Sequence, residues 1–552
     1  MTSASAKPAV TGDSSAVVLA YHARTKHTLK RYAAGPETLD WDLQPNPFRE
    51  FSGCPRTPLE PAAEGLATRF GEAIMPGGVS AAPLTLPSVG LLLELSLGLA
   101  AWKELGPDRW AVRCNPSSGN LHPTEAYVIA RGVAGLDDGV HHYLSRDHVL
   151  EHRCLGATPE GATPGLWIGL SSVHWREAWK YGERAFRYCQ LDLGHALGAL
   201  RYAAGAIGWR VRMVEGLDSA ALAALMGLDR TEDFAGVEAE EADVLLAVDT
   251  GPGRAPPAAP PMPAGPWTGR ANRLDAHPMY RWPVIDEVSA ATRSLGLPAN
   301  PPLAEAALAP PPERDARAAD ILLGRRSAQR FDARYHMPAE TFFALAEALL
   351  PRASVPWDVW NYRPRLHPVL FVHRVEGLAP GLYALPRHPA ALGDLKAALR
   401  TDFAWAPVAN APAHLPLHRL VESDARGVMR TVSCHQAIAG DSCFALSLLA
   451  EFAPRVSADP WRYRQLHWEA GLIGHVLYLE AERAGLRGTG IGCFFDDALH
   501  DLLGVEGDRF QSLYHFTVGR ALTDARISTL PAYPGRRPPP GASPSLSEDQ
   551  TP

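Results

Sequence analysis

The chain has 552 residues, which predicts two to four domains, because single hydrophobic cores rarely serve more than about 250 residues. Its composition, 46% hydrophobic and 20% charged, is that of a globular protein. A formal net charge of -7, with no run of Lys or Arg, argues against nucleic acid as a partner.

The ends and the cysteines predict a cytoplasmic protein without a membrane span. Residues 1–15 are small and polar, unlike a signal peptide. The most apolar window, 89–102, contains Glu94 and is shorter than the roughly 20 residues of a spanning helix. Seven cysteines without a C-x-x-C motif predict free thiols in a reducing compartment. Cys434-His435 could be a metal or nucleophile pair, but no second ligand cluster stands nearby, so no metal is expected.

Composition divides the chain into five parts. Residues 1–83 form an N-terminal extension, whose aromatic-rich part from Tyr21 to Phe51 could cover a site. Two Pro-rich stretches, 251–266 and 297–312, lie in a linker region over 251–313. The domains are then 84–250 and 314–531, and the Pro/Ser/Gly-rich tail 532–552 is expected to be disordered.

The periodicity of the chain predicts an α+β fold, with a sheet flanked by helices and rather few strands. Helix-like runs occur at 89–102, 184–207, 316–323, 339–350 and 468–484. Strand-like runs occur at 126–130, 243–248, 369–372 and 514–518.

The same signals recur in the same order in both halves. Leu-His-Pro stands at 121–123 and again at 366–368, each time with a strand-like run. A later helix carries Asp192-x-Gly194 in the first half and Glu469-x-Gly471 in the second. The order and spacing indicate an internal duplication.

Two polar segments are candidates for ligand binding. The loop Pro116-Ser117-Ser118-Gly119-Asn120 gathers two hydroxyls and a carboxamide, although such residues also bond their own backbone in ordinary turns. Arg325-Arg326-Ser327-Ala328-Gln329-Arg330 could bind a phosphate through its arginines, or could be a helix end whose cations complement the dipole.

A glycine-rich segment, Gly488-Thr489-Gly490-Ile491-Gly492, could let backbone approach a ligand closely. It does not fit the dinucleotide fingerprint, because an apolar pair follows it instead of the start of a helix.

A fourth segment runs from Trp179 to Tyr188. Its Lys180-Tyr181 pair could supply acid and base groups if the lysine is partly buried. Tyr188, Asp192 and His195 share one helix face, where a polar network bracing the helix is the simpler interpretation for Asp192 and His195.

Together these segments resemble the nitroreductase-fold flavoenzymes. The Arg-Arg-Ser-x-x-Arg and Pro-Ser-Ser-x-Asn motifs resemble that superfamily's FMN-binding segments. The run Trp-Lys-Tyr-Gly-Glu-Arg-Ala-Phe-Arg-Tyr at 179–188, followed by Asp-x-Gly-His, and the N-terminal Tyr-His-Ala-Arg-Thr-Lys-His at 21–27, are similar to the SagB/ThcOx-type dehydrogenases.

The resemblance implies two nitroreductase-like, FMN-dependent domains fused into an intramolecular pseudo-dimer, which could dimerise again. One composite FMN site would take residues from both halves and from a late cation: Pro116, Ser117, Ser118, Asn120, Arg325, Arg326, Ser327, Gln329, Arg330, Gly490, Gly492, Arg520 and Arg526. A second pocket, between 25–27 and 364–367, lacks the Ser-Ser-Asn set and is expected to be degenerate.

The resemblance also implies the chemistry. SagB-type enzymes oxidise azoline rings, so the substrate would be a modified peptide or a small-molecule natural product, with Lys180 and Tyr181 as acid and base. One alternative is an NAD(P)H-dependent nitro or quinone reductase. Another is a flavin-binding or storage protein without turnover.

Overall fold

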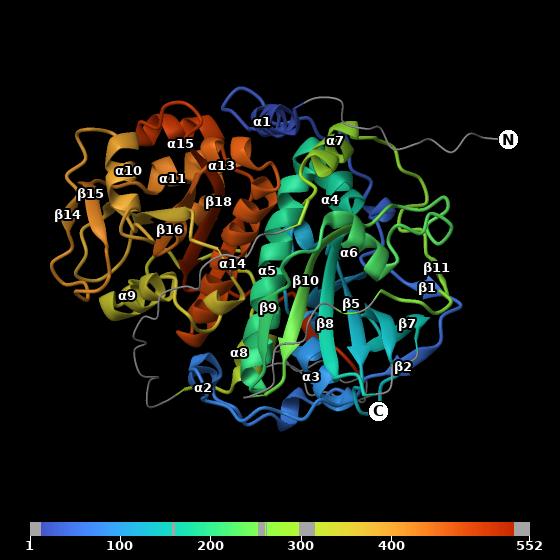
Figure 1. Ribbon diagram of the computed structural model, residues 1–552. Helices are drawn as coiled ribbons and strands as arrows, with labels where there is room; N and C mark the ends of the chain where they lie inside the picture. Colours follow the sequence, from blue (N-terminus) through green and yellow to red (C-terminus); the bar gives the residue numbers. More distant parts are fainter. Residues whose placement is uncertain are drawn as a thin grey trace, which may run out of the picture.

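The structure of the protein is a computed structural model that describes residues 13–156, 161–251, 260, 262–296, 315–360 and 362–534. It is a mixed α and β protein with two large antiparallel sheets, and two long helices lie side by side between them (Figure 1). The prediction of a mixed helix and sheet fold is confirmed, whereas the expectation of few strands is wrong, since each large sheet has seven.

The first sheet joins the N-terminal extension to the first half. Its order is β2 (Arg56–Pro58), β7 (Val149–Leu155), β6 (Gly139–Leu144), β5 (Thr124–Arg131), β8 (Gly165–Ser172), β10 (Glu241–Asp249) and β9 (Arg210–Met213). Strands β5, β8 and β10 are buried almost throughout, because they form the centre of the sheet and residues on both faces pack into cores.

The second sheet repeats the order of the first from the second strand to the seventh, and differs in the origin of its first edge strand. Its order is β14 (Ala406–Pro407), β15 (His418–Glu422), β13 (Gly381–Ala384), β12 (Leu366–Val372), β16 (Phe444–Glu451), β18 (Phe510–Gly519) and β17 (Arg487–Ile491). Strand β5 follows the first Leu-His-Pro, and β12 contains the second. Each lies between its hairpin partner and a strand from later in the chain.

Two central helices, α5 (Ala185–Ala206) and α14 (Arg462–Arg483), join the halves and run in the same direction. They touch at Gly194 and Gly471. A Cβ on Gly194 would lie 2.2 Å from the Trp468 carbonyl oxygen, and one on Gly471 would lie 2.1 Å from that of Leu191. The glycines of the two Asp/Glu-x-Gly motifs therefore permit a backbone contact that any side chain would prevent.

A second reciprocal contact joins α2 (Phe70–Ile74) and α8 (Ala318–Gly324). The Phe70 amide donates to the Ala316 carbonyl at 2.9 Å, and the Ala318 amide donates to the Thr68 carbonyl at 2.8 Å. Arg69 and Arg317 thus face each other as equivalent residues. Counting forward equally from these two residues places Gly77-Gly78-Val79 opposite Arg325-Arg326-Ser327.

The predicted helix over 89–102 is wrong in its second part. The helix α3 (Leu86–Ser96) ends before Gly98, where a Cβ would lie 2.9 Å from the Glu94 carbonyl oxygen. The chain then enters β3 (Leu99–Leu105), which contains Trp102. Strand β3 pairs with β4 (Asp108–Arg113) and with β19 (Ser528–Leu530) from the end of the chain, so this small sheet also joins the two halves.

The boundaries of the predicted linker and tail need correction. Within 251–313, β11 (Arg270–Ala271) pairs with β1 (Phe51–Ser52), and α7 (Pro283–Ala291) packs on α1 (Ser14–Arg24). Tyr533, placed in the tail, is buried and donates its hydroxyl to the Ser145 carbonyl at 2.8 Å. The Pro-rich runs 252–259 and 297–312 and the tail from 535 lie outside the described residues.

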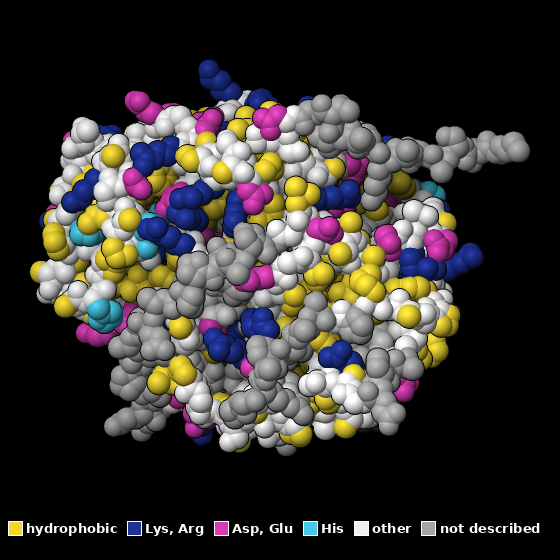
Figure 2. Space-filling model, in the orientation of Figure 1, with side chains coloured by type: hydrophobic (Ala, Val, Ile, Leu, Met, Phe, Trp, Pro, Cys, Tyr) yellow, Lys and Arg dark blue, Asp and Glu magenta, His cyan; other side chains and the backbone are white. Residues whose placement is uncertain are grey.

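The remaining helices flank the two sheets. They are α4 (His174–Tyr181), α6 (Ser219–Met226), α9 (Ala339–Ala348), α10 (Ala391–Ala398), α11 (Arg426–Val432), α12 (Ala437–Asp441), α13 (Ala453–Ala458) and α15 (Asp496–Leu503). Among the described residues, none of the helices combines the length and the apolar character that crossing a membrane requires. On the face in Figure 2, basic and acidic side chains are interspersed with hydrophobic ones.

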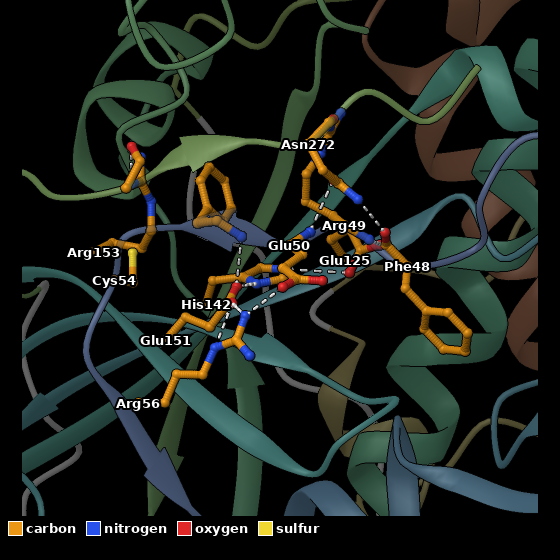
Figure 3. Close-up of polar contacts among 12 residues, drawn as sticks. Phe48, Arg49, Glu50, Cys54, Arg56, Glu125, His142, Glu151, Arg153 and Asn272 are labelled. Atoms are coloured by element: carbon orange, nitrogen blue, oxygen red, sulfur yellow. Dashed lines mark hydrogen bonds and ion pairs between the residues drawn. The ribbon is translucent and has the colours of Figure 1, made fainter. Parts of the chain in front are cut away.

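A buried ionic network fixes the N-terminal extension to the first sheet (Figure 3). His142 lies between two carboxylates, 3.3 Å from Glu125 and 3.0 Å from Glu151. Arg56 reaches Glu151 at 2.7 Å, and the Phe51 amide donates to Glu151 at 2.9 Å. Burial lowers the pKa of His142, but the two carboxylates outweigh burial and raise it to about 9.

Candidate functional site

A cavity of about 600 Å³ lies where the two halves meet. Its wall comes from the loop 115–120, from α5, from β3 and β4, from residues 324–329 and from β17. Of the residues predicted for a composite site, these line it: Pro116, Ser117, Ser118, Asn120, Tyr181, Arg325, Arg326, Ser327, Gln329, Gly490 and Gly492. The structure therefore brings together segments that are more than 350 residues apart in the sequence.

The polar side chains of the loop 116–120 hold the loop in place. Ser117 donates its hydroxyl to Asp192 at 2.6 Å, and Ser118 donates both its amide, at 3.1 Å, and its hydroxyl, at 3.0 Å, to the same carboxylate. Asn120 donates its amide to the Ala111 carbonyl at 2.8 Å. The sequence predicted that these groups face a ligand, but in the structure they hold the loop in place. Asp192 is buried, so its carboxylate requires hydrogen-bond donors, which the loop supplies.

The buried position of Asp192 sets its pKa. Burial raises the pKa of Asp192 to about 7, although the hydrogen bonds from Ser117 and Ser118 act in the opposite direction. In the second half, Glu469 accepts the backbone amides of Arg365, at 3.0 Å, and of Leu366, at 3.3 Å. Each half therefore fixes the loop before its central strand to a carboxylate on its long helix.

Three cations gather at one end of the cavity without an ion-pair partner, although the charge of Glu482 acts on Arg325 and Arg326 from further away. Arg325 donates to the carbonyls of Cys114, at 2.9 Å, and Arg113, at 3.2 Å, and Lys103 donates to the Thr529 hydroxyl at 2.5 Å. Among the described residues, no carboxylate lies within 4.0 Å of Arg325, Arg326 or Lys103.

The pKa values of these cations reflect their crowding. Burial, and then the charge of Arg325, lowers the pKa of Arg326 to about 10. Burial, and then the charges of Arg326 and Arg487, lowers the pKa of Lys103 to about 8. Arg487 also lines the cavity, with Glu482 at 3.5 Å. Because buried charge without a partner is unfavourable, the site is suited to a strongly negative group such as a phosphate.

The glycine-rich segment is the edge strand β17, and its glycines serve packing. A Cβ on Gly490 would lie 1.7 Å from the Tyr514 hydroxyl, and one on Gly492 would lie 2.1 Å from the Tyr188 ring. Tyr478 accepts the Gly490 amide at 3.0 Å and exchanges a hydrogen bond with Ser327 at 2.8 Å. Tyr188, Tyr478 and Tyr514 therefore lie against the cavity floor, close to the glycines of this segment.

Lys180 and Tyr181 end α4 behind the tip of the loop. Tyr181 lines the cavity, and a Cβ on Gly119 would lie 2.7 Å from its hydroxyl and 3.1 Å from Lys180 Nζ. Lys180 is partly buried, with its Nζ 5.0 Å from the Trp41 ring centre. Burial lowers the pKa of Lys180, while Glu177 acts in the opposite direction.

Four predicted cations are not among the residues that line the cavity: Lys180, Arg330, Arg520 and Arg526. Arg520 stacks on Tyr335, with its guanidinium 3.8 Å from the ring centre, and Arg526 pairs with Asp524 at 2.7 Å in an exposed position. Arg330 is exposed outside the lining. Sequence analysis missed instead these lining residues: Lys103, Arg487, Tyr478, Tyr514 and Cys493. No local motif marks them, because their placement depends on how the halves pack.

The predicted second pocket is paired wrongly. Thr25 and His27 contact Arg187 and Asp496, whereas Arg365 pairs with Glu451 at 2.6 Å. The reciprocal contact of α2 and α8 makes Gly77-Gly78-Val79 the counterpart of Arg325-Arg326-Ser327. The predicted pairing failed because Thr25-Lys26-His27 shares its polar, basic character with the arginine motif, whereas the true counterpart, Gly77-Gly78, does not.

The residues equivalent to the cavity wall have different partners in the other half. Arg201 stands where α14 has Tyr478, seven residues after each contacting glycine. It pairs with Asp358 at 2.7 Å, and Trp357 and Trp360 beside Asp358 are buried. This equivalent place therefore has Gly77 and Gly78 at the positions of Arg325 and Arg326. It also has buried tryptophans beside Asp358, the ion-pair partner of Arg201.

A group of two histidines and one glutamate could in principle hold a metal ion. The ligand atoms of His367, His388 and Glu451 lie within 4.8 Å of one another. However, Nδ1 of His367 accepts the Arg387 amide at 3.1 Å and Nδ1 of His388 accepts the Ala391 amide at 3.1 Å. Each ring therefore carries its proton on Nε2, which donates toward Glu451, and Arg365 pairs with the same carboxylate, so the group is better suited to a hydrogen-bond network around Glu451.

Comparison with known proteins identifies the fold. A solved structure of a candidate nitroreductase from Anabaena variabilis superposes with a TM-score of 0.65 at 21% identity, covering 92% of this chain and 99% of that one. The chain has a nitroreductase-like fold. The similarity spans both seven-stranded sheets.

Sequence similarity points the same way over a shorter stretch. The chain is 27% identical over 124 residues to a candidate nitroreductase of Methanocaldococcus jannaschii, which is 20% of this chain and 59% of that protein. The match thus spans less than two thirds of the curated relative. The Escherichia coli microcin synthetase McbBCD complex matches 44% of this chain and 94% of its own chain, at 18% identity and a TM-score of 0.27, too low to carry an argument. No protein-family description matches the chain.

Proposed function

We propose that the protein is an FMN-dependent oxidoreductase of the SagB-type dehydrogenase kind, which oxidises an azoline-type ring in a peptide or small-molecule natural product. The observation that carries this proposal is the group of cations without an ion-pair partner, the buried Arg325 and Arg326 and the partly buried Lys103, at one end of a cavity of about 600 Å³ in a nitroreductase-like fold. Such a group needs a phosphate-like partner, and FMN carries one.

The residues present fit FMN. Arg325, Arg326 and Lys103 would hold its phosphate, since arginine forks and an ammonium bind phosphate strongly. Ser327 and Gln329 line the same wall and offer a hydroxyl and an amide, while three tyrosines supply an apolar floor. The cavity volume is in the range of ordinary cofactor sites, about 300–1,000 Å³.

When bound, FMN would supply the transfer of a hydride. The chain's own residues would then handle the proton. Lys180 Nζ, with its lowered pKa, is closer to a working base at neutral pH than an ordinary lysine, and the adjacent Tyr181 hydroxyl can donate a hydrogen bond in the cavity. The carboxylate of Asp192 holds the loop that separates Lys180 from the cavity centre.

The choice of the SagB kind rests on sequence. The Lys-Tyr pair and the run around it at 179–188 carry the resemblance. The similarity to a candidate nitroreductase favours a second candidate, an NAD(P)H-dependent nitro or quinone reductase. A storage role is less well supported, because Trp41, the aromatic residue over Lys180, is 59% exposed and so does not close the site.

Anaerobic reduction of the FMN-loaded protein distinguishes these functions. Loss of flavin absorbance with an azoline-containing peptide, but not with NADPH, supports the dehydrogenase. Loss with NADPH supports the reductase, and loss only with dithionite supports storage. If the purified chain binds no FMN at all, the proposed function is wrong.

We also propose that the chain arose by duplication and that its halves form a pseudo-dimer around the one FMN site. The order of six strands that the two sheets share and the two reciprocal contacts support this. The domains would then be residues 84–250, with α2 and β2 added from the N-terminal extension, and residues 314–531, whose β19 pairs with β3 of the first half.

A further inference from the structure

Two cysteines, one of which lines the cavity, are in direct contact. Cys493 directly follows the glycines of β17 and lines the cavity, and its Sγ lies 2.8 Å from the Sγ of Cys434. Both side chains are partly exposed. Cys434 comes from the end of α11, 59 residues earlier, so the fold brings two distant thiols into direct contact.

The backbone at Cys434 is held in an unfavourable conformation that produces this contact. Cys434 has φ 53° and His435 has φ 60°, two consecutive non-glycine residues in the left-handed region. L-residues rarely adopt this conformation in succession, and it persists where the surrounding structure imposes it. Here the side-chain Nε2 of Gln436 donates to the Cys493 carbonyl at 3.2 Å, which fastens the turn to the segment that carries the partner thiol.

The surroundings of Cys493 favour its thiolate. His27 Nδ1 accepts the Ala33 amide at 2.8 Å, so its proton is on Nε2, which is free to donate to the Cys493 sulfur. The Arg184 guanidinium donates to the Gly492 carbonyl at 3.2 Å and adds positive charge beside the same residue. Asp496 balances part of that charge, through ion pairs of 3.0 Å to Arg184 and to Arg187.

These contacts separate the two thiols chemically. The hydrogen bond with Cys434 lowers the pKa of Cys493, and His27 and Arg184 act in the same direction against burial. The same contact raises the pKa of Cys434. A low-pKa thiol in contact with a protonated one is the arrangement that dithiol redox centres use.

We propose that Cys434 and Cys493 form a redox-active dithiol that exchanges electrons with small disulfides entering the cavity. The Cys493 thiolate attacks one sulfur of a disulfide R–S–S–R, and one R–S⁻ leaves. Cys434 then loses its proton and displaces the second R–S⁻ from Cys493, which closes the Cys434–Cys493 disulfide. Two protein thiols are oxidised and one disulfide is reduced to two thiols. This chemistry does not depend on the proposed flavin function.

Oxidised glutathione provides the test. The full chain is incubated with it, quenched in acid, alkylated under denaturing conditions and digested with trypsin. We expect a disulfide between the peptides 431–455 and 488–509, which reduced glutathione reopens. The Cys443→Ser variant is the control, because Cys443 lies in the first of these peptides, and the cross-link should persist in it.

The single variants test the order of the steps. Cys434→Ser should trap one glutathione on Cys493, whereas Cys493→Ser should leave Cys434 unmodified. Cys54→Ser, which changes another partly exposed thiol, should behave as the wild type. The proposal is overturned if both cysteines of the wild type remain alkylatable after oxidation, or if the disulfide joins other cysteines.

Discussion

At the scale of single residues, Arg326 links stability to ligand binding. It is buried without a carboxylate partner among the described residues, so replacing it by Met should stabilise the ligand-free protein. The same change should weaken FMN binding about 10- to 100-fold, because a charge-assisted contact contributes roughly 1.5–3 kcal/mol. Thermal unfolding without ligand and FMN titration would measure the two effects.

The matched control for Arg326→Met is Arg334→Met. The Arg334 side chain is 90% exposed and pairs with Asp332 at the surface, so this change should leave both quantities unaltered. If Arg326→Met lowers the ligand-free stability, or leaves the FMN affinity as it was, the cation group is not an anion site.

The raised pKa of Asp192 leads to a second prediction, on how the stability of the protein depends on pH. Its pKa in the folded chain is about 7, above the ordinary 3.8, so ionising it opposes folding. The unfolded chain therefore releases this proton first, and stability falls as pH rises from 3.8 to about 7. Asp192→Asn should flatten that part of the profile, as urea unfolding at both ends of the window would reveal. An unchanged slope would show that Asp192 is already ionised in the folded chain.

At the scale of elements, the His142 network attaches the N-terminal extension to β6 and β7. The pKa of His142 is raised from 6.5 to about 9, so its contribution to stability is complete below 6.5 and is lost as pH rises through 9. His142→Gln should be less stable than the wild type at low pH and should lose this part of the pH dependence. Guanidinium unfolding at several pH values measures this.

The control for His142→Gln is His277→Gln, because His277 is exposed on the chain that leads to α7. It should keep the wild-type profile. Limited proteolysis offers a local readout: if the network attaches the extension, cleavage near Arg56 should increase above pH 9 in the wild type. Equal cleavage across the pH range would mean that other contacts hold this segment.

Local patterns predicted some elements well and others poorly. The long helices around Asp192 and Glu469 and the central strands β5 and β12 were predictable, since each has a continuous hydrophobic pattern of one period. The strand β3 could not be predicted, because its apolar residues follow those of α3 without a change in composition. Only Gly98, which fits the helix end, marks the change.

At the scale of the whole molecule, the composite site was predictable in part. Arg325 and Arg326 of the motif and the loop 116–120 could be identified by resemblance, and they line the cavity. Lys103 could not, because it reaches the cavity through the pairing of β3 with β19, more than 400 residues later. The counterpart of the arginine motif, Gly77-Gly78-Val79, could not be predicted either. The reciprocal contact that identifies it consists of backbone hydrogen bonds, which have no sequence signature.

This asymmetry between the halves leads to a prediction for the whole chain, one FMN per molecule. The cavity has Arg325 and Arg326, while its counterpart has Gly77 and Gly78, and Trp357 is buried beside the Asp358 partner of Arg201. Absorbance after denaturation should therefore give one FMN per chain. Arg325→Leu should reduce this number toward zero, whereas Arg365→Leu, in the loop of the other half, should not change it. Two FMN per chain, or one remaining in Arg325→Leu, would mean that the other half also binds flavin.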